Sequence, residues 1–165
     1  FEHPRMVLVE DLVLLPDGQQ TKYLKYKHTG DAATIVAMRD ERILVQREYS
    51  HPPNKVLYQF PGGVVPAGED PSEGANRELM EECGMRGTLR EIGSYYIDNR
   101  RMEAKMYVFV ATDLEDAKLP ADDEEFLEHE WYSEDQIDEL LPSGAVTHSH
   151  MLATWALFKL SKQKR

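Results

Sequence analysis

The glutamates at positions 78, 81 and 82 are the residues whose types and spacing point most directly to chemistry. Side chains three or four positions apart lie on one face of an α-helix, so these carboxylates would be neighbours. Like charges so close together repel each other, and clustered carboxylate oxygens suit hard divalent cations such as Mg²⁺ or Mn²⁺. A solvated acidic helix face is the alternative, and three glutamates alone would favour it.

The residues around these glutamates predict a helix that begins after Asp70 and ends at Gly84. Asp70 is a good capping residue, Pro71 suits the first helical position, and Glu73 stands where a capping box needs it. Gly84 suits the left-handed conformation that ends many helices. A second face of this helix is apolar and should pack on the protein core; it contains Ala75, Leu79 and Cys83.

The loop and helix of residues 63–85 resemble the Nudix box, G-x5-E-x7-R-E-U-x-E-E-x-G-U, in which U is a bulky aliphatic residue. Every fixed position is matched, by Gly63, Glu69, Arg77, Glu78, Leu79, Glu81, Glu82, Gly84 and Met85. A match of this length inside a capped helix is specific, and the chain is therefore similar to the Nudix hydrolase superfamily.

This resemblance implies a metal site that binds Mg²⁺, with Mn²⁺ as the alternative. Glu78 and Glu82 are the first choices for its ligands, Glu81 follows closely, and the backbone carbonyl of Gly62 adds one more oxygen. Glu81 is also a candidate catalytic residue. The expected reaction is attack of water on a pyrophosphate linkage, with a glutamate accepting the proton.

The remaining box residues are expected to be structural. Arg77 lies one turn before Glu81, where its guanidinium could pair with a carboxylate and reduce the repulsion within the acidic cluster. Glu69 is expected to support the loop rather than bind the metal. Gly63 and Gly84 meet requirements of the backbone, because glycine allows conformations and close approaches that a side chain forbids.

Outside the box, a catalytic base is expected on the acidic loop of residues 122–125, and Glu125 is the preferred candidate. A solvated acidic loop is the alternative for any one of its residues. Arg47 and Arg101 are candidates for substrate binding, with a surface ion pair as the alternative for Arg47. His148 and His150 are two positions apart, so we expect them not to face one site if both lie on the predicted last helix.

The chain reads as an α+β fold in a single domain of residues 1–165. We expect an antiparallel hairpin at 6–28, broken by Gly30, and a Gly-rich loop at 61–63. Further strands are predicted at 32–38, 43–49, 56–60, 88–97, 105–111 and 128–132, an acidic connection at 112–130, and helices at 133–141 and 147–162. The buried stripe of the last helix should contain Met151, Leu152, Trp155, Phe158 and Leu160.

The resemblance implies more: a mixed sheet between helices, the α/β/α sandwich of Nudix proteins. Residues 1–30, with the stretches ILVQREYSHP and LYQFPGG, also resemble the ADP-ribose pyrophosphatase branch. In that branch the N-terminal hairpin helps to build a dimer, so a homodimer is expected.

Charge and composition limit the partners of the chain. The net charge of −11 argues against a nucleic-acid surface, which would need clustered Lys and Arg. No apolar run is long enough to span a membrane. The single Cys allows no disulfide within the chain and fits a cytoplasmic location.

The sequence therefore predicts a Nudix pyrophosphatase that acts on a nucleoside diphosphate linked to another group. ADP-ribose or a related sugar nucleotide is favoured, with a nucleoside monophosphate and a sugar phosphate as products. The chain lacks a proline that the ADP-ribose branch commonly carries after the box. The alternatives are a hydrolase that removes unwanted nucleoside triphosphates and a non-catalytic Nudix module that senses a nucleotide.

Overall fold

The computed structural model describes residues 2–3, 6–27, 30–120 and 127–163. The strands are β1 (Glu2–His3), β2 (Met6–Leu14), β3 (Gln20–Lys27), β4 (Gly30–Arg39), β5 (Arg42–Ser50), β6 (Lys55–Gln59), β7 (Gly62–Pro66), β8 (Met85–Tyr96), β9 (Lys105–Asp116) and β10 (Leu127–Tyr132). The helices are α1 (Pro71–Cys83), α2 (Glu134–Leu140) and α3 (Ser149–Gln163). Within these described ranges, no helix has the length and hydrophobicity needed to cross a membrane.

The main sheet has seven strands, and β4 lies at its centre. The order is β10-β5-β4-β9-β8, with β6 added beside β5 and β7 beside β4. β4 pairs with β9 in parallel, whereas its pairings with β5 and β7 are antiparallel. The sheet is therefore mixed, which confirms the predicted α+β class.

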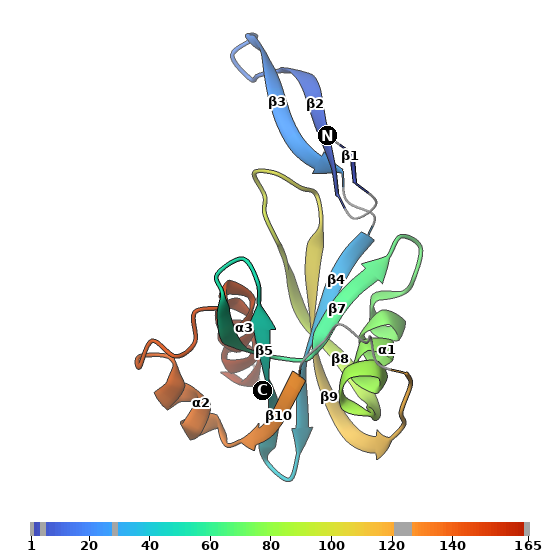
Figure 1. Ribbon diagram of the computed structural model, residues 1–165, viewed down its shortest axis with the longest axis vertical. Coiled ribbons are helices and arrows are strands. Elements are labelled where there is room, and N and C mark those ends of the chain that lie inside the picture. The colour runs from blue at the N-terminus through green and yellow to red at the C-terminus, as the bar shows by residue number, and fades with distance from the viewer. Residues whose placement is uncertain (1, 4–5, 28–29, 121–126, 164–165) are drawn as a thin grey trace.

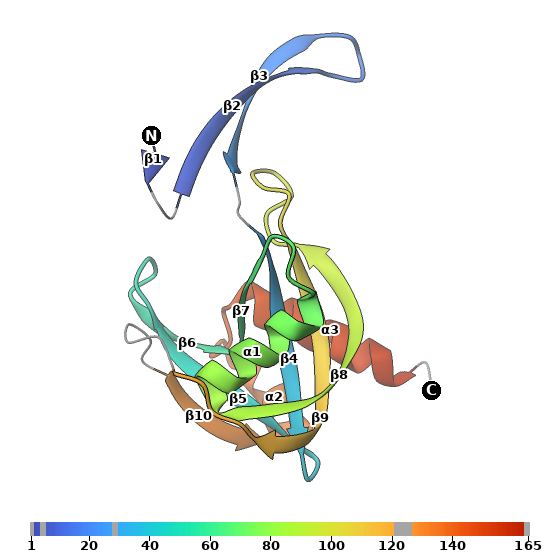
Figure 2. The same ribbon diagram turned by 90° about the vertical axis from the view of Figure 1, so that its right-hand side faces the viewer.

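Helices cover both faces of this sheet, and the two faces bury alternate residues of β4. Ala33, Ile35 and Ala37 pack into a core with α1, whereas Val36 faces the core formed with α2 and α3. Successive strand residues point to opposite faces, so a continuous apolar run is needed when both faces are covered. Figure 2 shows α1 in front of the sheet and α3 behind it, as expected for an α/β/α sandwich.

The N-terminal strands form a separate antiparallel sheet, β1-β2-β3, that projects from the rest of the molecule (Figure 1). The expected hairpin at 6–28 is confirmed for β2 and β3. Its base is held by a hydrogen bond from the Tyr26 N–H to the Arg101 carbonyl at 2.7 Å and by another from the Tyr23 hydroxyl to the Arg100 carbonyl at 2.8 Å.

One face of the hairpin carries large apolar side chains in water. Leu12, Leu14 and Leu24 are 69%, 70% and 50% exposed. They share a face, because Leu12 and Leu14 are two apart on β2 and Leu24 lies opposite Glu10 on β3. Exposed leucines gathered on one face are typical of a surface that packs against another molecule.

The predicted ends of α1 are confirmed. The Asp70 carboxylate accepts hydrogen bonds from the N–H groups of Ser72 at 2.8 Å and Glu73 at 3.4 Å. Gly84 ends the helix in the left-handed conformation, with φ of 66°. At α2, Ser133 and Gln136 form a complete capping box.

Three boundaries differ from the predictions. The strand predicted from residue 32 begins at Gly30, where a side chain would lie 2.1 Å from the Val65 carbonyl oxygen. Residues 62–66, expected to begin in a loop, form β7 because their backbone pairs with β4. β9 continues to Asp116, paired with β8, so the acidic connection begins later than predicted.

The predicted buried stripe of α3 is right at Met151, Trp155 and Phe158, which are almost fully buried. It is wrong at Leu152 and Leu160, which are 42% and 52% exposed because they lie off the face that turns to the sheet. α3 begins at Ser149, so the prediction of a helix from residue 147 placed its start too early.

Because of this later start, the two histidines do not both lie on the helix, which was the condition of the prediction made for them. His148 precedes the helix and His150 lies in its first turn, and their rings are 5.1 Å apart, edge to face. The His150 ring also stacks on Tyr95 of β8, with ring centroids 5.8 Å apart. Both histidines are half-buried, and burial lowers the pKa of each imidazole below its usual value.

These histidines should make folding sensitive to mild acid. An imidazole whose pKa is lower in the folded protein than the ordinary 6.5 binds protons more readily when unfolded, so its contribution to stability falls as pH drops below that value. We expect the melting temperature to fall between about pH 7.5 and pH 5.5, and His150→Gln to make that fall shallower. His51→Gln, at an exposed position, is the control and should keep the wild-type pH dependence. An equal pH dependence in all three proteins would contradict this prediction.

Candidate active site

A cluster of carboxylates around Arg77 forms the centre of the candidate site. The guanidinium binds Glu69 through two N–H groups, each at 3.2 Å. Its Nη1 donates to Glu78 and to Glu81, both at 2.8 Å. The Arg77 side chain is 30% exposed and that of Glu78 14%, so these charges are only partly screened by water.

These contacts explain how the acidic helix is tolerated. A guanidinium offers five donors in one plane and can bind several carboxylates at once. The hydrogen bonds to Glu69 and Glu78, with their negative charges, raise the pKa of Arg77 well above its usual value, so it stays cationic. Arg77 thus joins Glu69 of the loop to Glu78 and Glu81 of the helix.

Glu82 lies on the other side of the cluster, against the start of β7. Its Oε2 accepts a hydrogen bond from the Gly62 N–H at 2.9 Å and another from Nε2 of Gln46, also at 2.9 Å. The sheet therefore contributes one backbone donor and one side-chain donor to a carboxylate of the helix.

Gly62, just before the box, and Gly63, its first residue, lie where the backbone comes close to other groups. Gly62 has φ of 148°, and a Cβ there would lie 2.1 Å from the Ala33 carbonyl oxygen. A Cβ on Gly63 would lie 2.5 Å from Oε2 of Glu78. A side chain at position 62 would therefore clash with the backbone of the central strand, whereas one at position 63 would displace the Glu78 carboxylate.

The donor set fits a hard divalent cation. The Glu82 carboxylate accepts from the Gly62 N–H, and the Glu78 carboxylate lies against Gly63, so two carboxylates of the helix meet the backbone at the start of β7. Oxygen donors of this kind suit Mg²⁺ or Mn²⁺. Among the described residues, however, no three acidic, histidine or cysteine side chains form a ready cage, and three of the box carboxylates bind Arg77 instead.

The candidate residues outside the box are distributed differently. Arg47 is exposed on β5, where it pairs with Glu128 at 3.1 Å and lies over the Tyr58 ring. Arg101 lies in the β8–β9 connection, over the ring of Tyr23 at the base of the hairpin. The structure thus places Arg101 beside the hairpin. Glu125 lies outside the described residues.

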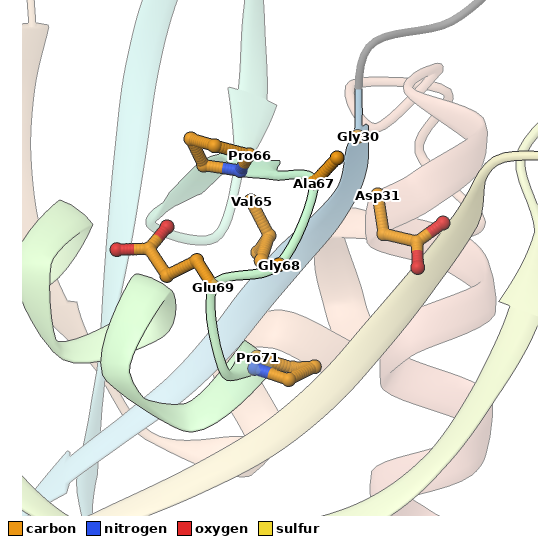
Figure 3. A pocket seen from close by; sticks show the side chains of 8 residues that line it. All are labelled: Gly30, Asp31, Val65, Pro66, Ala67, Gly68, Glu69 and Pro71. Atoms are coloured by element: carbon orange, nitrogen blue, oxygen red, sulfur yellow. The ribbon is translucent and has the colours of Figure 1, made fainter.

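Two small cavities adjoin the box. One, of about 220 Å³, lies around the loop from Val65 to Glu69, and Figure 3 shows the carboxylates of Asp31 and Glu69 pointing away from each other there. The other, of about 70 Å³, is lined by Gly62, Gly63, His148 and His150 among others. Gly62 and Gly63 therefore line a cavity together with two imidazoles, and they also contact the carboxylates of Glu78 and Glu82.

The sequence did not identify Gln46 as part of the site, although Gln46 contacts Glu82. Gln46 is fully buried, and its Nε2 also lies 3.3 Å from His129 and 3.5 Å from the Cys83 sulfur. Burial and the Glu82 charge raise the pKa of Cys83 to about 12, so this thiol stays protonated. A polar residue inside the apolar run of β5 was the available signal.

Comparisons with known proteins agree with this geometry. A family model described as the NUDIX domain matches residues 28–155. The ADP-ribose pyrophosphatase of Bacillus subtilis (strain 168) is 31% identical over 123 residues, which are 73% of this chain and 66% of that protein. The ADP compounds hydrolase NudE of Escherichia coli (strain K12) is 30% identical over 124 residues, 73% of this chain and 67% of the relative.

A solved structure described as an ADP compounds hydrolase superposes with a TM-score of 0.90 at 22% identity, covering 99% of this chain and 90% of that one. At this identity the likeness concerns the fold. The family match extends over most of the chain and includes the whole box that the carboxylate cluster occupies. The chain therefore belongs to the Nudix family.

Proposed function

We propose that this protein is a metal-dependent pyrophosphatase that cleaves a nucleoside diphosphate linked to a second group. The substrate is ADP-ribose or a related sugar nucleotide, and the products are a nucleoside monophosphate and a sugar phosphate. The observation that carries the proposal is the gathering of Glu78 and Glu82 at the backbone of Gly62 and Gly63. The relatives named for ADP-ribose and ADP compounds support the substrate class.

In this mechanism Glu78, Glu81, Glu82 and the Gly62 carbonyl would hold the cation. The bound cation would polarise the phosphoryl oxygens and offset the charge that develops on them. Arg77 keeps the box carboxylates close together before the cation arrives, because it binds Glu69, Glu78 and Glu81 at the same time. Gly62 and Gly63 bring the peptide backbone within reach of those oxygens.

The proton of the attacking water needs an acceptor. We place that role on Glu125, and Glu81 is the alternative within the box. A base on a separate acidic segment avoids a conflict, because a carboxylate that binds the metal is less able to accept a proton. Arg47, exposed on β5, remains the proposed contact for a substrate phosphate, which would have to displace its pairing with Glu128.

Two other functions are possible for this fold. A nucleoside triphosphate hydrolase would use the same carboxylates, and the substrate alone distinguishes it. A non-catalytic nucleotide sensor would not need the complete acidic set that the chain retains. Neither alternative gives the projecting hairpin a role.

The substrate class is tested by turnover of a panel that contains ADP-ribose, sugar nucleotides, dinucleotides and deoxynucleoside triphosphates, with Mg²⁺ and with excess chelator. We expect turnover of ADP-ribose or another sugar nucleotide to exceed that of the triphosphates, and chelation to abolish it. Faster cleavage of triphosphates would favour the second function. Full activity in chelator would exclude the metal mechanism, and no turnover of any compound would favour the sensor.

The roles of the carboxylates are tested by two isosteric substitutions. Glu82→Gln should lower kcat by roughly 100-fold or more and weaken Mn²⁺ binding, because it removes a ligand of the metal that acts in the transition state. Glu125→Gln should lower kcat with little change in KM or in Mn²⁺ affinity. Glu115→Gln, which alters an exposed ion pair of β9, is the control and should resemble wild type. A kcat of Glu82→Gln close to wild type would contradict the ligand assignment.

We further propose that the protein is a homodimer and that the exposed leucine face of the hairpin forms part of its interface. Leu12, Leu14 and Leu24 are each at least half exposed in the single chain. Burying such side chains gains about 1.5–3 kcal/mol each, which favours association over leaving them in water.

Light scattering after size-exclusion chromatography should therefore give the mass of two chains. Leu14→Asp should shift that mass to one chain, because a carboxylate would have to be buried without a partner. Leu160→Asp, at a leucine of α3 that is 52% exposed, is the control and should remain dimeric. A wild-type protein with the mass of a single chain would refute the proposal.

A further inference from the structure

Gln46 contacts Glu82 from the sheet, and nothing in the box motif accounts for it. We propose that Gln46 is a positioning residue that fixes the orientation of the Glu82 carboxylate for cation binding. This inference rests on the proposed function, because it assumes that Glu82 is a metal ligand. It concerns a residue of β5, which lies outside the box.

The position of Gln46 is one where an apolar side chain would be expected. It lies on β5 between β10 and β6, opposite His129 and Gln59. It shares a strand face with Leu44, which packs into the core beneath α1. Gln46 itself is 0% exposed, so its amide has lost all contact with bulk water.

The Nε2 group of this amide makes its shortest contact with Glu82. It donates to Oε2 at 2.9 Å, and the Gly62 N–H donates to the same oxygen at 2.9 Å. One donor comes from β5 and the other from β7, so they approach from different parts of the sheet. Two donors fixed in this way define where Oε2 lies, and the rigid carboxylate then has little freedom to rotate.

The amide must point its nitrogen at Glu82, because the amide oxygen would be repelled by the carboxylate. A neutral donor has a particular advantage here. It orients the carboxylate while leaving its negative charge in place for a cation. The neutral Gln46 thus differs from the cationic Arg77, which binds the other three box carboxylates.

The other end of the amide shows that this arrangement is costly. Oε1 of Gln46 is buried and has no hydrogen-bond partner in the part of the chain that the structure describes. A buried polar group left without a hydrogen-bond partner destabilises the folded state. An apolar side chain of the same length would avoid that cost, so stability alone does not explain a glutamine at this position.

The test is Gln46→Met, which keeps the length of the side chain and removes the donor. Calorimetric titration with Mn²⁺ alone, without substrate, measures the affinity of the site. We expect that affinity to fall by about 10–100-fold, as is usual when a group that orients a metal ligand is removed. The melting temperature should stay the same or rise. Activity at limiting Mg²⁺ should fall strongly, with partial recovery of kcat at high Mg²⁺.

The control is Thr154→Val, on the opposite face of the sheet. Thr154 is also 0% exposed, and its hydroxyl is likewise buried without a hydrogen-bond partner among the described residues. This substitution should leave Mn²⁺ affinity unchanged. It shows whether removing any buried polar group alters the metal site.

A purely structural role for Gln46 predicts the reverse result. In that case Gln46→Met would lower the melting temperature and leave Mn²⁺ affinity within about twofold of wild type, and this outcome would overturn the proposal. If Gln46→Met does not fold, Gln46→Leu is judged by the same two measurements. An unchanged Mn²⁺ affinity in Glu82→Gln would instead show that the assumed metal ligand is wrong, which separates the two failures.

Discussion

The guanidinium of Arg77 is the interaction on which the arrangement of the site depends. It binds Glu69, Glu78 and Glu81, which come from the loop before α1 and from α1 itself. Without a positive group, these three carboxylates would repel one another, and the loop before α1 would favour another conformation. Because Arg77 also donates to the Val64 carbonyl at 2.9 Å, the same side chain joins the helix to β7. A single residue thus sets both the electrostatics and the geometry of the box.

Glu82 is held by a different means. Its Oε2 is bound by donors from the sheet, the Gly62 N–H and the Gln46 amide. Within the box, Glu82 is therefore oriented by neutral donors, whereas Glu69, Glu78 and Glu81 all bind the Arg77 guanidinium. This division is chemically useful, because neutral donors preserve the charge that a divalent cation needs, while the shared guanidinium limits repulsion among the rest.

The close packing of β7 against β4 makes both arrangements possible. At Gly30 and at Gly62 a Cβ would lie 2.1 Å from a carbonyl oxygen of the neighbouring strand. These positions bring the two strands together at both ends of β7, so the peptide groups beside the carboxylates belong to a well-packed sheet. The hairpin, by contrast, extends away from this sheet (Figure 1) and presents leucines that no described part of the chain covers.

Local signals in the sequence determined α1 and the acidic set it carries. Asp70, Pro71 and Gly84 define the ends of the helix through interactions with neighbouring residues, and the spacing of Glu78, Glu81 and Glu82 follows from the helical repeat. The β2–β3 hairpin was equally predictable, because a turn and two alternating segments lie close together in the chain. These features need few contacts between distant residues.

Only the tertiary structure decided what surrounds those carboxylates. Gln46 reaches Glu82 across 36 positions of sequence, and the two histidines meet because α3 begins at Ser149 rather than earlier. The strand β7 was not predicted. Its Gly-rich segment adopts an extended conformation because β4 supplies its hydrogen bonds, and this pairing is not visible in the local sequence. Long-range pairing leaves little trace in local residue patterns, so the motif was visible in the sequence but the groups that orient it were not.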